Sequence, residues 1–252
     1  MPHLTVMTYN IRTGIGMDGV RDLERIAGVI RESAAVVVGL QEVDKGTTRS
    51  DGVDQTKVLA GLLGMDYVFG PAYPHRGGFF GPAVLTVPIL EKRLITLPHK
   101  ETNESRMAVW VRVQWEGREI IVINTHLEHA DPEDRARQGA ALAEIVAEAV
   151  QSAPTMLMGD LNARPSEVAV FTGIKNYLRD AYELAMERAR GNGKADDLGE
   201  GFTFDSVRPY KRIDYVWLDP RLDLADEEGA FRIVPNQASD HMPLVVRVRT
   251  VQ

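Results

Sequence analysis

Short apolar segments that each stop at polar residues are the feature that most restricts how this chain of 252 residues can fold. Residues 35–40 form a continuous apolar run that ends at Gln41–Glu42, and residues 156–158 stop at Gly159–Asp160. Strands that are covered on both faces have such continuous runs, whereas half-exposed strands alternate between apolar and polar residues. The segments therefore predict buried strands whose polar ends lie at the rim of a sheet.

Helical patterns lie between these strands. Asp22 is a predicted N-cap for a helix with an apolar face, and a second helix is predicted to stop at Gly64. Asp131 followed by Pro132 predicts the start of a long helix that reaches about residue 152. Helices that alternate with strands are typical of an α/β protein.

Hairpins are also indicated, so the sheet is predicted to be mixed. Residues 109–114 alternate between apolar and polar, and Glu116–Gly117 fits the turn of a hairpin. Residues 70–82 are rich in glycine, proline and aromatic residues and are predicted to form an irregular surface loop. Residues 190–201 are predicted to form a flexible loop, and residues 1–252 are predicted to be one domain.

Composition and charge exclude several classes of function. The net charge of -7 argues against a broad basic surface for nucleic acid. The chain has no cysteine, so thiol nucleophiles are excluded and oxygen or imidazole groups must hold any metal. No signal peptide is visible, and no apolar run approaches the roughly 18 residues that span a bilayer. We expect a cytoplasmic protein with no stable membrane insertion and no obligate protein partner.

Polar residues suited to metal binding or proton transfer recur at the ends of the predicted strands. Strand ends lie side by side in a layered sheet, so these groups are expected to converge on one cleft. An alternative for any single one of them is a plain turn residue or a solvated strand exit. In chain order they are Asn10, Glu42, Asn124, His126, Asp160, Asn162, Asp214, Asp240 and His241.

Six short motifs that contain these residues, taken in order, closely resemble the endonuclease/exonuclease/phosphatase superfamily, which has the deoxyribonuclease-I-like fold. The resemblance extends from residue 8 to residue 244, and the motifs are Thr8–Asn10, Leu40–Glu42, Asn124–Leu127, Gly159–Asn162, Arg212–Tyr215 and Ser239–Leu244. It implies a four-layered α/β sandwich with two mixed β-sheets face to face and helices outside. It also implies hydrolysis of phosphate esters with a divalent cation, usually Mg²⁺, with Mn²⁺ as a substitute.

The resemblance implies a role for each polar strand end. Glu42 matches the metal-binding glutamate, and Asn10 and Asp240 match positions that complete or support the metal shell. Asp160 matches the acid that orients or deprotonates the attacking water, and Asn162 matches an amide that holds the phosphate.

Two histidines complete the implied set. His126 and His241 match the catalytic histidines, and Asp214 matches the carboxylate that orients the second of them. Which group is the acid and which the base stays open, as does the number of metal ions. Asn124, Arg212 and Arg106 are assigned to the substrate phosphate, although a surface arginine needs no such explanation.

One position departs from the pattern. Many relatives carry Gly-Asn-Ala where this chain has Gly81–Ala83, and Pro82 supplies neither an amide side chain nor a backbone donor. The substrate therefore stays open between a small phosphate ester, a nucleic acid and a lipid head group. A catalytically impaired module that binds phosphate or nucleic acid on the same fold is the alternative to an enzyme.

Overall fold

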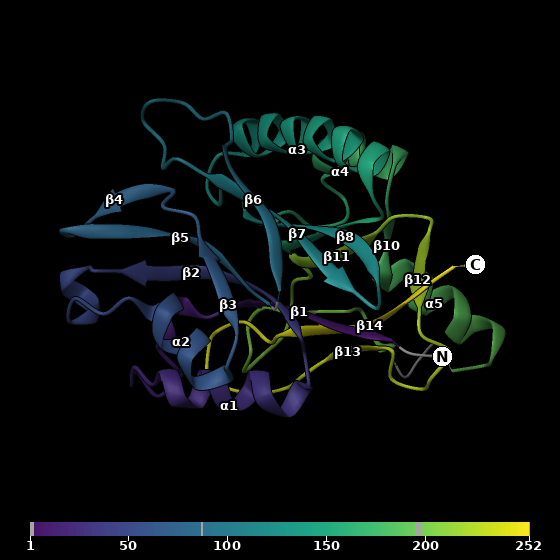
Figure 1. Ribbon diagram of the computed structural model, residues 1–252, viewed down its shortest axis with the longest axis horizontal. Helices are drawn as coiled ribbons and strands as arrows, with labels where there is room; N and C mark the ends of the chain where they lie inside the picture. Colours follow the sequence, from purple (N-terminus) through teal and green to yellow (C-terminus); the bar gives the residue numbers. More distant parts are fainter. Residues whose placement is uncertain (1–2, 87, 195–197, 252) are drawn as a thin grey trace.

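Two mixed β-sheets pack face to face at the centre of the molecule, as predicted (Figure 1). The structure is a computed structural model that describes residues 3–86, 88–194 and 198–251. The larger sheet has the order β12 (Leu222–Leu224), β14 (Leu244–Thr250), β1 (Leu4–Asn10), β2 (Val37–Lys45), β5 (Gly78–Thr86) and β3 (Asp66–Phe69), while β13 (Phe231–Ile233) pairs with β14 and β4 (Tyr73–His75) with β5. The smaller sheet has the order β10 (Arg179–Asp180), β11 (Asp214–Leu218), β9 (Thr155–Asp160), β8 (Arg118–His126), β7 (Met107–Trp115) and β6 (Ile89–Thr96).

Helices cover the outer face of each sheet. In Figure 1, α1 and α2 lie below the larger sheet and α3 and α4 lie above the smaller one. Helix α5 lies near the strands at the opposite end of the molecule from β4. The bounds are α1 (Leu23–Ser33), α2 (Gln55–Leu63), α3 (Pro132–Ser152), α4 (Val168–Phe171) and α5 (Ala181–Gly191), with 3₁₀ turns η1 (Arg12–Gly14), η2 (Thr48–Ser50) and η3 (Ile174–Asn176).

Three hydrophobic cores separate the four layers. The central core lies between the sheets and is rich in valine, including Val6, Val84, Val109 and Val122. A second core packs the smaller sheet against α3 and α4, and a third packs the larger sheet against α1 and α2. Because successive strand residues point to opposite faces, continuous apolar strands can supply two cores at once. This confirms the predicted four-layered α/β sandwich.

The predicted helix ends are confirmed by their capping contacts. The Asp22 side chain accepts a hydrogen bond from Arg25 N, and the Asp131 side chain accepts from two backbone N–H groups at the start of α3. Gly64 ends α2 with φ of 67°, a left-handed conformation that glycine adopts at little cost.

The prediction of an irregular loop over residues 70–82 is wrong. Residues 73–75 form β4, and β5 begins at Gly78 and pairs with β2, β3 and β4. The glycines allow close backbone approach, since a Cβ on Gly81 would lie 1.9 Å from Gly70 O. Of the predicted loop over residues 190–201, α5 occupies the first two, and residues 195–197 lie outside the described part.

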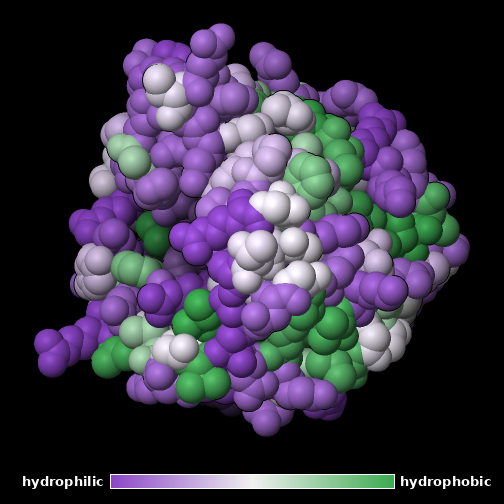
Figure 2. Space-filling model, turned by 90° about the vertical axis from the view of Figure 1, so that its left-hand side faces the viewer, coloured by the Kyte–Doolittle hydropathy of each residue, from purple (hydrophilic) through white to green (hydrophobic). Residues whose placement is uncertain are grey.

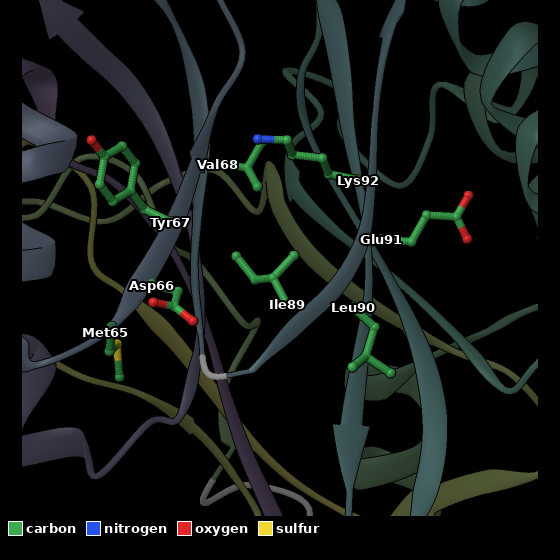
Figure 3. A pocket seen from close by; sticks show the side chains of 8 residues that line it. All are labelled: Met65, Asp66, Tyr67, Val68, Ile89, Leu90, Glu91 and Lys92. Atoms are coloured by element: carbon green, nitrogen blue, oxygen red, sulfur yellow. The ribbon is translucent and has the colours of Figure 1, made fainter.

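The edge strands β3 and β6 leave a groove of about 450 Å³ between the two sheets (Figure 3). Ile89 and Lys92 on β6 point toward Val68 on β3, whereas Glu91 points the other way. Leu90 and Leu94 on β6 are about half exposed. The groove contains none of the predicted site residues.

The amide of Asn124 joins the two sheets. From β8, its Nδ2 donates to Leu40 O at 2.9 Å and to Ala83 O at 2.8 Å, both in the larger sheet. Its Oδ1 accepts from Gln41 Nε2 at 2.7 Å. A Cβ on Gly39 would lie 2.6 Å from Asn124 Oδ1, so glycine makes room for the bridge. All of these groups are fully buried, where an unpaired polar group is costly.

We expect Asn124→Ala to lower the free energy of unfolding by roughly 2–4 kcal/mol, because it leaves buried acceptors of the larger sheet without donors. Denaturant unfolding of the purified variant measures this loss. Asn176→Ala, at an exposed position, is the matched control and should change stability by about 0.5 kcal/mol or less. A loss below about 1 kcal/mol for Asn124→Ala would show that the bridge is not a major support.

Candidate active site

The two sheets bring the polar strand ends to one rim. His126 at the end of β8 is paired in register with Asp160 at the end of the parallel β9. Asp214 begins the antiparallel β11 opposite Asp160. In the other sheet, β1 ends at Asn10, and His241 lies just before β14, which pairs with β1. Strands of both directions therefore contribute to one site.

A cleft of about 360 Å³ opens at this rim. The hairpin of β4 and β5 forms part of its wall. Figure 2 looks onto the end of the molecule from which this hairpin projects, and the surface there is largely hydrophilic with smaller hydrophobic patches. The predicted site residues that line the cleft are Glu42, Arg106, His126, Asp160, Asn162, Asp240 and His241.

Asn10 connects two acids across the sheets. Its Nδ2 donates to Glu42 Oε1 at 3.0 Å and to Asp160 Oδ2 at 3.0 Å, while its Oδ1 accepts from Arg12 N at 3.1 Å. Asn10 is fully buried. It therefore acts as a brace that sets the separation of the two carboxylates.

A β-bulge presents Glu42 to the cleft. Leu40 pairs with Ala83 and Val43 with Gly81, so that Gln41 and Glu42 both lie opposite Pro82. Glu42 has φ of 57°, a left-handed conformation that is uncommon outside glycine. Proline is tolerated at bulges, which explains how β5 accommodates Pro82 next to the site.

The turn after β9 is equally specific. Gly159 has φ of 145°, and a Cβ there would lie 2.1 Å from Thr125 O. Asp160 Oδ1 accepts from Asn162 N at 2.9 Å, and Asn162 itself has φ of 48°. Asn162 Nδ2 donates to Leu127 O and lies 3.0 Å from His126 Nε2. The amide is thus aimed at the imidazole by its own backbone.

His241 is held as a cation by two acids. Its Nδ1 lies 2.9 Å from Asp214 Oδ2, and its Nε2 lies 3.7 Å from Asp160 Oδ2. Burial lowers the pKa of His241, but the charges of Asp214 and Asp160 outweigh it and raise the pKa to about 10. The imidazole is therefore protonated at neutral pH, with Nε2–H directed toward Asp160.

His126 has the opposite protonation. Burial, followed by the positive charge of Arg106, lowers its pKa well below the usual value. Its Nε2 lies 3.6 Å from Asp160 Oδ2, and its Nδ1 lies 3.4 Å from Arg106 Nη1. The site therefore holds one neutral and one charged imidazole on either side of the same carboxylate.

Burial raises the pKa of both carboxylates that Asn10 joins, Glu42 and Asp160. For Asp160 the nearby charge of Asp214 adds to burial, and the pKa rises to about 7. For Glu42 burial outweighs the hydrogen bond from Asn10, and the pKa lies above its usual range. Two buried acids of this kind are stabilised in their charged forms by a nearby cation.

Three residues were assigned to substrate phosphate, and the structure places only Arg106 in the cleft. Its Nη2 lies 3.1 Å from Glu104 Oε2 and 3.5 Å from Glu128 Oε2. The placements expected for the other two need correction. Asn124 lies between the sheets with its amide engaged, and Arg212 is buried against Asp180 at 2.6 Å with its guanidinium stacked on two tyrosine rings.

The donor chemistry of the rim fits a divalent cation such as Mg²⁺. Glu42 and Asp240 offer carboxylate oxygens to the cleft, and Glu42 Oε2 has no hydrogen-bond partner among the described residues. Such hard oxygen donors suit Mg²⁺, which keeps several waters. Asp160, Asp214 and His241 also bring ligand atoms within 4.8 Å of one another. In that group the protonated imidazole is already hydrogen-bonded to Asp214, which disfavours metal binding there.

Sequence reasoning missed several neighbours of the site. The Phe204 ring packs 4.9 Å from the His241 ring, and Thr203 Oγ1 lies 3.3 Å from Asp214 N. Arg49 and Tyr73 also line the cleft. Thr203 and Phe204 precede the Arg212–Tyr215 motif in the sequence, and this closeness is the signal that could have identified them. Arg49 and Tyr73 belong to none of the six motifs.

The architecture and the rim define a class of protein: a two-sheet α/β sandwich with acids, amides and imidazoles at one end. The sequence matches the Endonuclease/Exonuclease/phosphatase family over residues 7–241. The chain therefore belongs to this family, as its motifs had indicated.

Solved structures share the fold. An endonuclease/exonuclease/phosphatase from Beutenbergia cavernae is 25% identical, with a TM-score of 0.76 over 99% of this chain and 72% of that one. The mannosyl-6-phosphatase of Bacteroides thetaiotaomicron is 20% identical, with a TM-score of 0.76 over 99% of this chain and all of that one. TDP2 of D. rerio, complexed with single-strand DNA product, is 18% identical, with a TM-score of 0.75 over 99% of this chain and all of that one.

Two further comparisons gave negative results. The chain has no significant match among curated proteins. Within residues 3–86, 88–194 and 198–251, none of the helices is both long and apolar enough to cross a membrane.

We expect His241→Gln to lower the free energy of unfolding by roughly 1.5–3 kcal/mol below pH 6.5, measured by denaturant unfolding in EDTA. The folded pKa of about 10 exceeds the unfolded value near 6.5, so the folded state binds the proton more tightly. This contribution is complete below pH 6.5 and is lost as the pH rises toward 10. The difference between wild type and variant should shrink over that range, and a difference independent of pH would refute the charged assignment.

Proposed function

We propose that the protein hydrolyses phosphate esters by in-line attack of water at phosphorus. Membership of the Endonuclease/Exonuclease/phosphatase family supports phosphate-ester hydrolysis. The observation that carries the proposal is the environment of Asp160, which is joined to Glu42 through Asn10 and lies 3.6 and 3.7 Å from the two histidines. Because the six motifs are intact and Pro82 is the departure noted from the family pattern, catalysis is preferred over a module that only binds phosphate.

Asp160 is the proposed base for the attacking water. Its Oδ1 is fixed by Asn162 N and its Oδ2 by Asn10, so the carboxylate cannot rotate away from the cleft. A raised pKa makes a carboxylate a better proton acceptor while it stays partly ionised at neutral pH. Phosphoryl transfer depends mainly on positioning and charge stabilisation, which such a fixed acid supplies.

Three donors are proposed to hold the phosphate oxygens. The Nε2–H of His241 faces the space beside Asp160, and Asp214 keeps this imidazole protonated. Asn162 Nδ2 lies in the same space and would exchange its hydrogen bond to His126 for one to a phosphate oxygen, because its other N–H donates to Leu127 O. Arg106 adds a guanidinium at the cleft wall. His126, neutral and hydrogen-bonded to Asn162, orients that amide.

A divalent cation, Mg²⁺ or Mn²⁺, would be held by Glu42, with Asp240 and Asn10 completing or supporting its surroundings. When bound, it would neutralise charge that develops on the phosphate. Glu42 is positioned for this by the bulge and by the hydrogen bond from Asn10. The remaining Glu42 oxygen faces the cleft without a protein donor among the described residues.

The substrate is proposed to be a small or single-stranded phosphate ester. Proteins that share the fold include the mannosyl-6-phosphatase of Bacteroides thetaiotaomicron and TDP2 of D. rerio, the latter complexed with a single-strand DNA product. A cleft of about 360 Å³ and a net charge of -7 favour a short ligand over a long duplex. A panel of phosphate esters and nucleic acids with Mg²⁺ and Mn²⁺ tests this directly.

We expect Glu42→Ala and Asp160→Ala to separate metal binding from proton transfer. Each should lower turnover of bis-p-nitrophenyl phosphate by roughly 10²- to 10⁴-fold, because each removes a group needed in the transition state. Calorimetric titration with Mg²⁺ should show binding lost in Glu42→Ala and kept in Asp160→Ala.

Glu101→Gln is the matched control, since Glu101 is exposed outside the cleft. It should retain wild-type turnover and Mg²⁺ affinity. Full activity of Glu42→Ala under controlled metal would refute the assignment of Glu42. No metal binding and no turnover by the wild type would instead favour a binding module.

A further inference from the structure

One side of the cleft is unused by the proposed chemistry. Arg49, Tyr73 and Phe80, here called the Arg49 shelf, line the cleft together with Glu42 and Arg106. They come from the loop after β2 and from the hairpin of β4 and β5. The Arg49 guanidinium lies 5.1 Å from the centre of the Phe80 ring, and the Tyr73 ring lies 5.3 Å from that ring.

A buried acid fixes the orientation of Arg49. Asp44 is fully buried and accepts from Arg49 Nε and Nη2, both at 2.8 Å. It also accepts from the hydroxyls of Thr47 and Ser50. Although burial raises the pKa of Asp44, the hydrogen bond from Arg49 and those from the hydroxyls hold it below the usual range. The guanidinium is thus positioned before any ligand binds.

The supporting backbone is also tightly packed. Thr48 N donates to Arg76 O at 2.9 Å, which ties the loop to the β4–β5 hairpin. A Cβ on Gly78 would lie 2.3 Å from Lys45 O, so the two segments are in direct backbone contact. A guanidinium on such a support loses little side-chain entropy when a ligand binds.

The free edge of Arg49 determines what the shelf can bind. Nε and Nη2 contact Asp44, whereas Nη1 has no hydrogen-bond partner among the described residues. The neighbouring Tyr73 hydroxyl donates to Glu104 Oε1 at 2.8 Å and is already used. A planar guanidinium edge with free N–H groups matches the oxygens of a phosphate.

We propose that Arg49 binds a second phosphate group of the substrate, beside the phosphate that is hydrolysed. The inference rests on the proposed function and deepens it, because it selects substrates that carry two neighbouring phosphates. Such a group belongs either to a small bisphosphate or to the next linkage of a nucleic-acid strand. Arg49 is then a residue for specificity and has no part in the chemical step.

Equilibrium binding of nucleotides tests whether Arg49 binds a second phosphate, independently of turnover. Thymidine 5′-monophosphate and thymidine 3′,5′-bisphosphate are titrated into wild type and Arg49→Lys in EDTA. The bisphosphate should bind the wild type roughly 10- to 100-fold more tightly, and the variant should lose most of this preference, because a lysine drawn to Asp44 lacks the free guanidinium edge. Equal affinities in the wild type, or no binding of either nucleotide, would overturn the proposal.

Arg76→Lys is the matched control, since Arg76 is exposed on the same hairpin but does not line the cleft. It should keep the wild-type preference. Thermal melting checks that Arg49→Lys is folded, and Phe80→Leu, which removes the ring beneath the guanidinium but leaves the ion pair, should weaken the preference in the same direction. A preference that survives both Arg49→Lys and Phe80→Leu would contradict the assignment.

Turnover assays distinguish a small bisphosphate from a nucleic-acid strand as the source of the second phosphate. They also distinguish failure of the Arg49 assignment from failure of the proposed hydrolase activity. Wild type and Arg49→Lys are assayed with bis-p-nitrophenyl phosphate, the nucleoside bisphosphate, and a single-stranded oligonucleotide with a phosphate or a neutral methylphosphonate next to the cleaved linkage. Arg49→Lys should lower kcat/KM roughly 10-fold or more only where a second charged phosphate is present. An equal loss of kcat/KM on all substrates in Arg49→Lys would refute the binding of a second phosphate by Arg49. Absence of wild-type turnover with every substrate would refute the proposed hydrolase activity.

Discussion

The amide bridge from Asn124 to the opposite sheet is the interaction on which the geometry of the rim depends. It joins β8 to the backbone of β2 and β5 and engages Gln41, the residue before Glu42. His126 follows Asn124 by two residues on the same strand. The bridge therefore fixes the distance between the sheet that carries Glu42 and the sheet that carries the histidine. Valine contacts alone would allow the sheets to slide, because apolar packing is not directional.

Electrostatics divides the rim into parts with different tasks. Asp160 lies between a neutral and a charged imidazole, and this asymmetry arises from the partners of each ring. Asp214 faces His241, whereas Arg106 faces His126. Groups of the same type with opposite pKa shifts are characteristic of sites that move protons. The buried charge of Asp160 is unfavourable for folding and is tolerated at the rim.

The sequence predicted the buried strands and the helix caps, because apolar runs and capping residues act locally. The four layers were implied by the family resemblance, and the order of the strand ends predicted the convergence of most polar residues. The sequence could not predict the placement of Asn124. Asn124 and His126 lie on the same face of β8, and only their depth relative to β2 and β5 decides which one reaches the cleft. Arg212 was similarly hidden, since its partners Asp180 and Tyr182 are some 30 residues away in the chain. The β4–β5 hairpin was missed because glycines permit close packing as well as disorder.

The bulge opposite Pro82 makes the site sensitive to the number of residues in β2, and not only to their identity. Leu40 and Val43 both pack into the core under α1 and α2, although residues three apart on a regular strand point to opposite faces. The extra residue of the bulge places Leu40 and Val43 on the same face of the sheet. The same bulge turns Glu42 to the cleft. Deletion of one residue here would move every following side chain of the strand to the opposite face of the sheet. We therefore expect that β2 does not tolerate insertions or deletions next to the bulge. The number of residues in this strand determines which side chains reach the site.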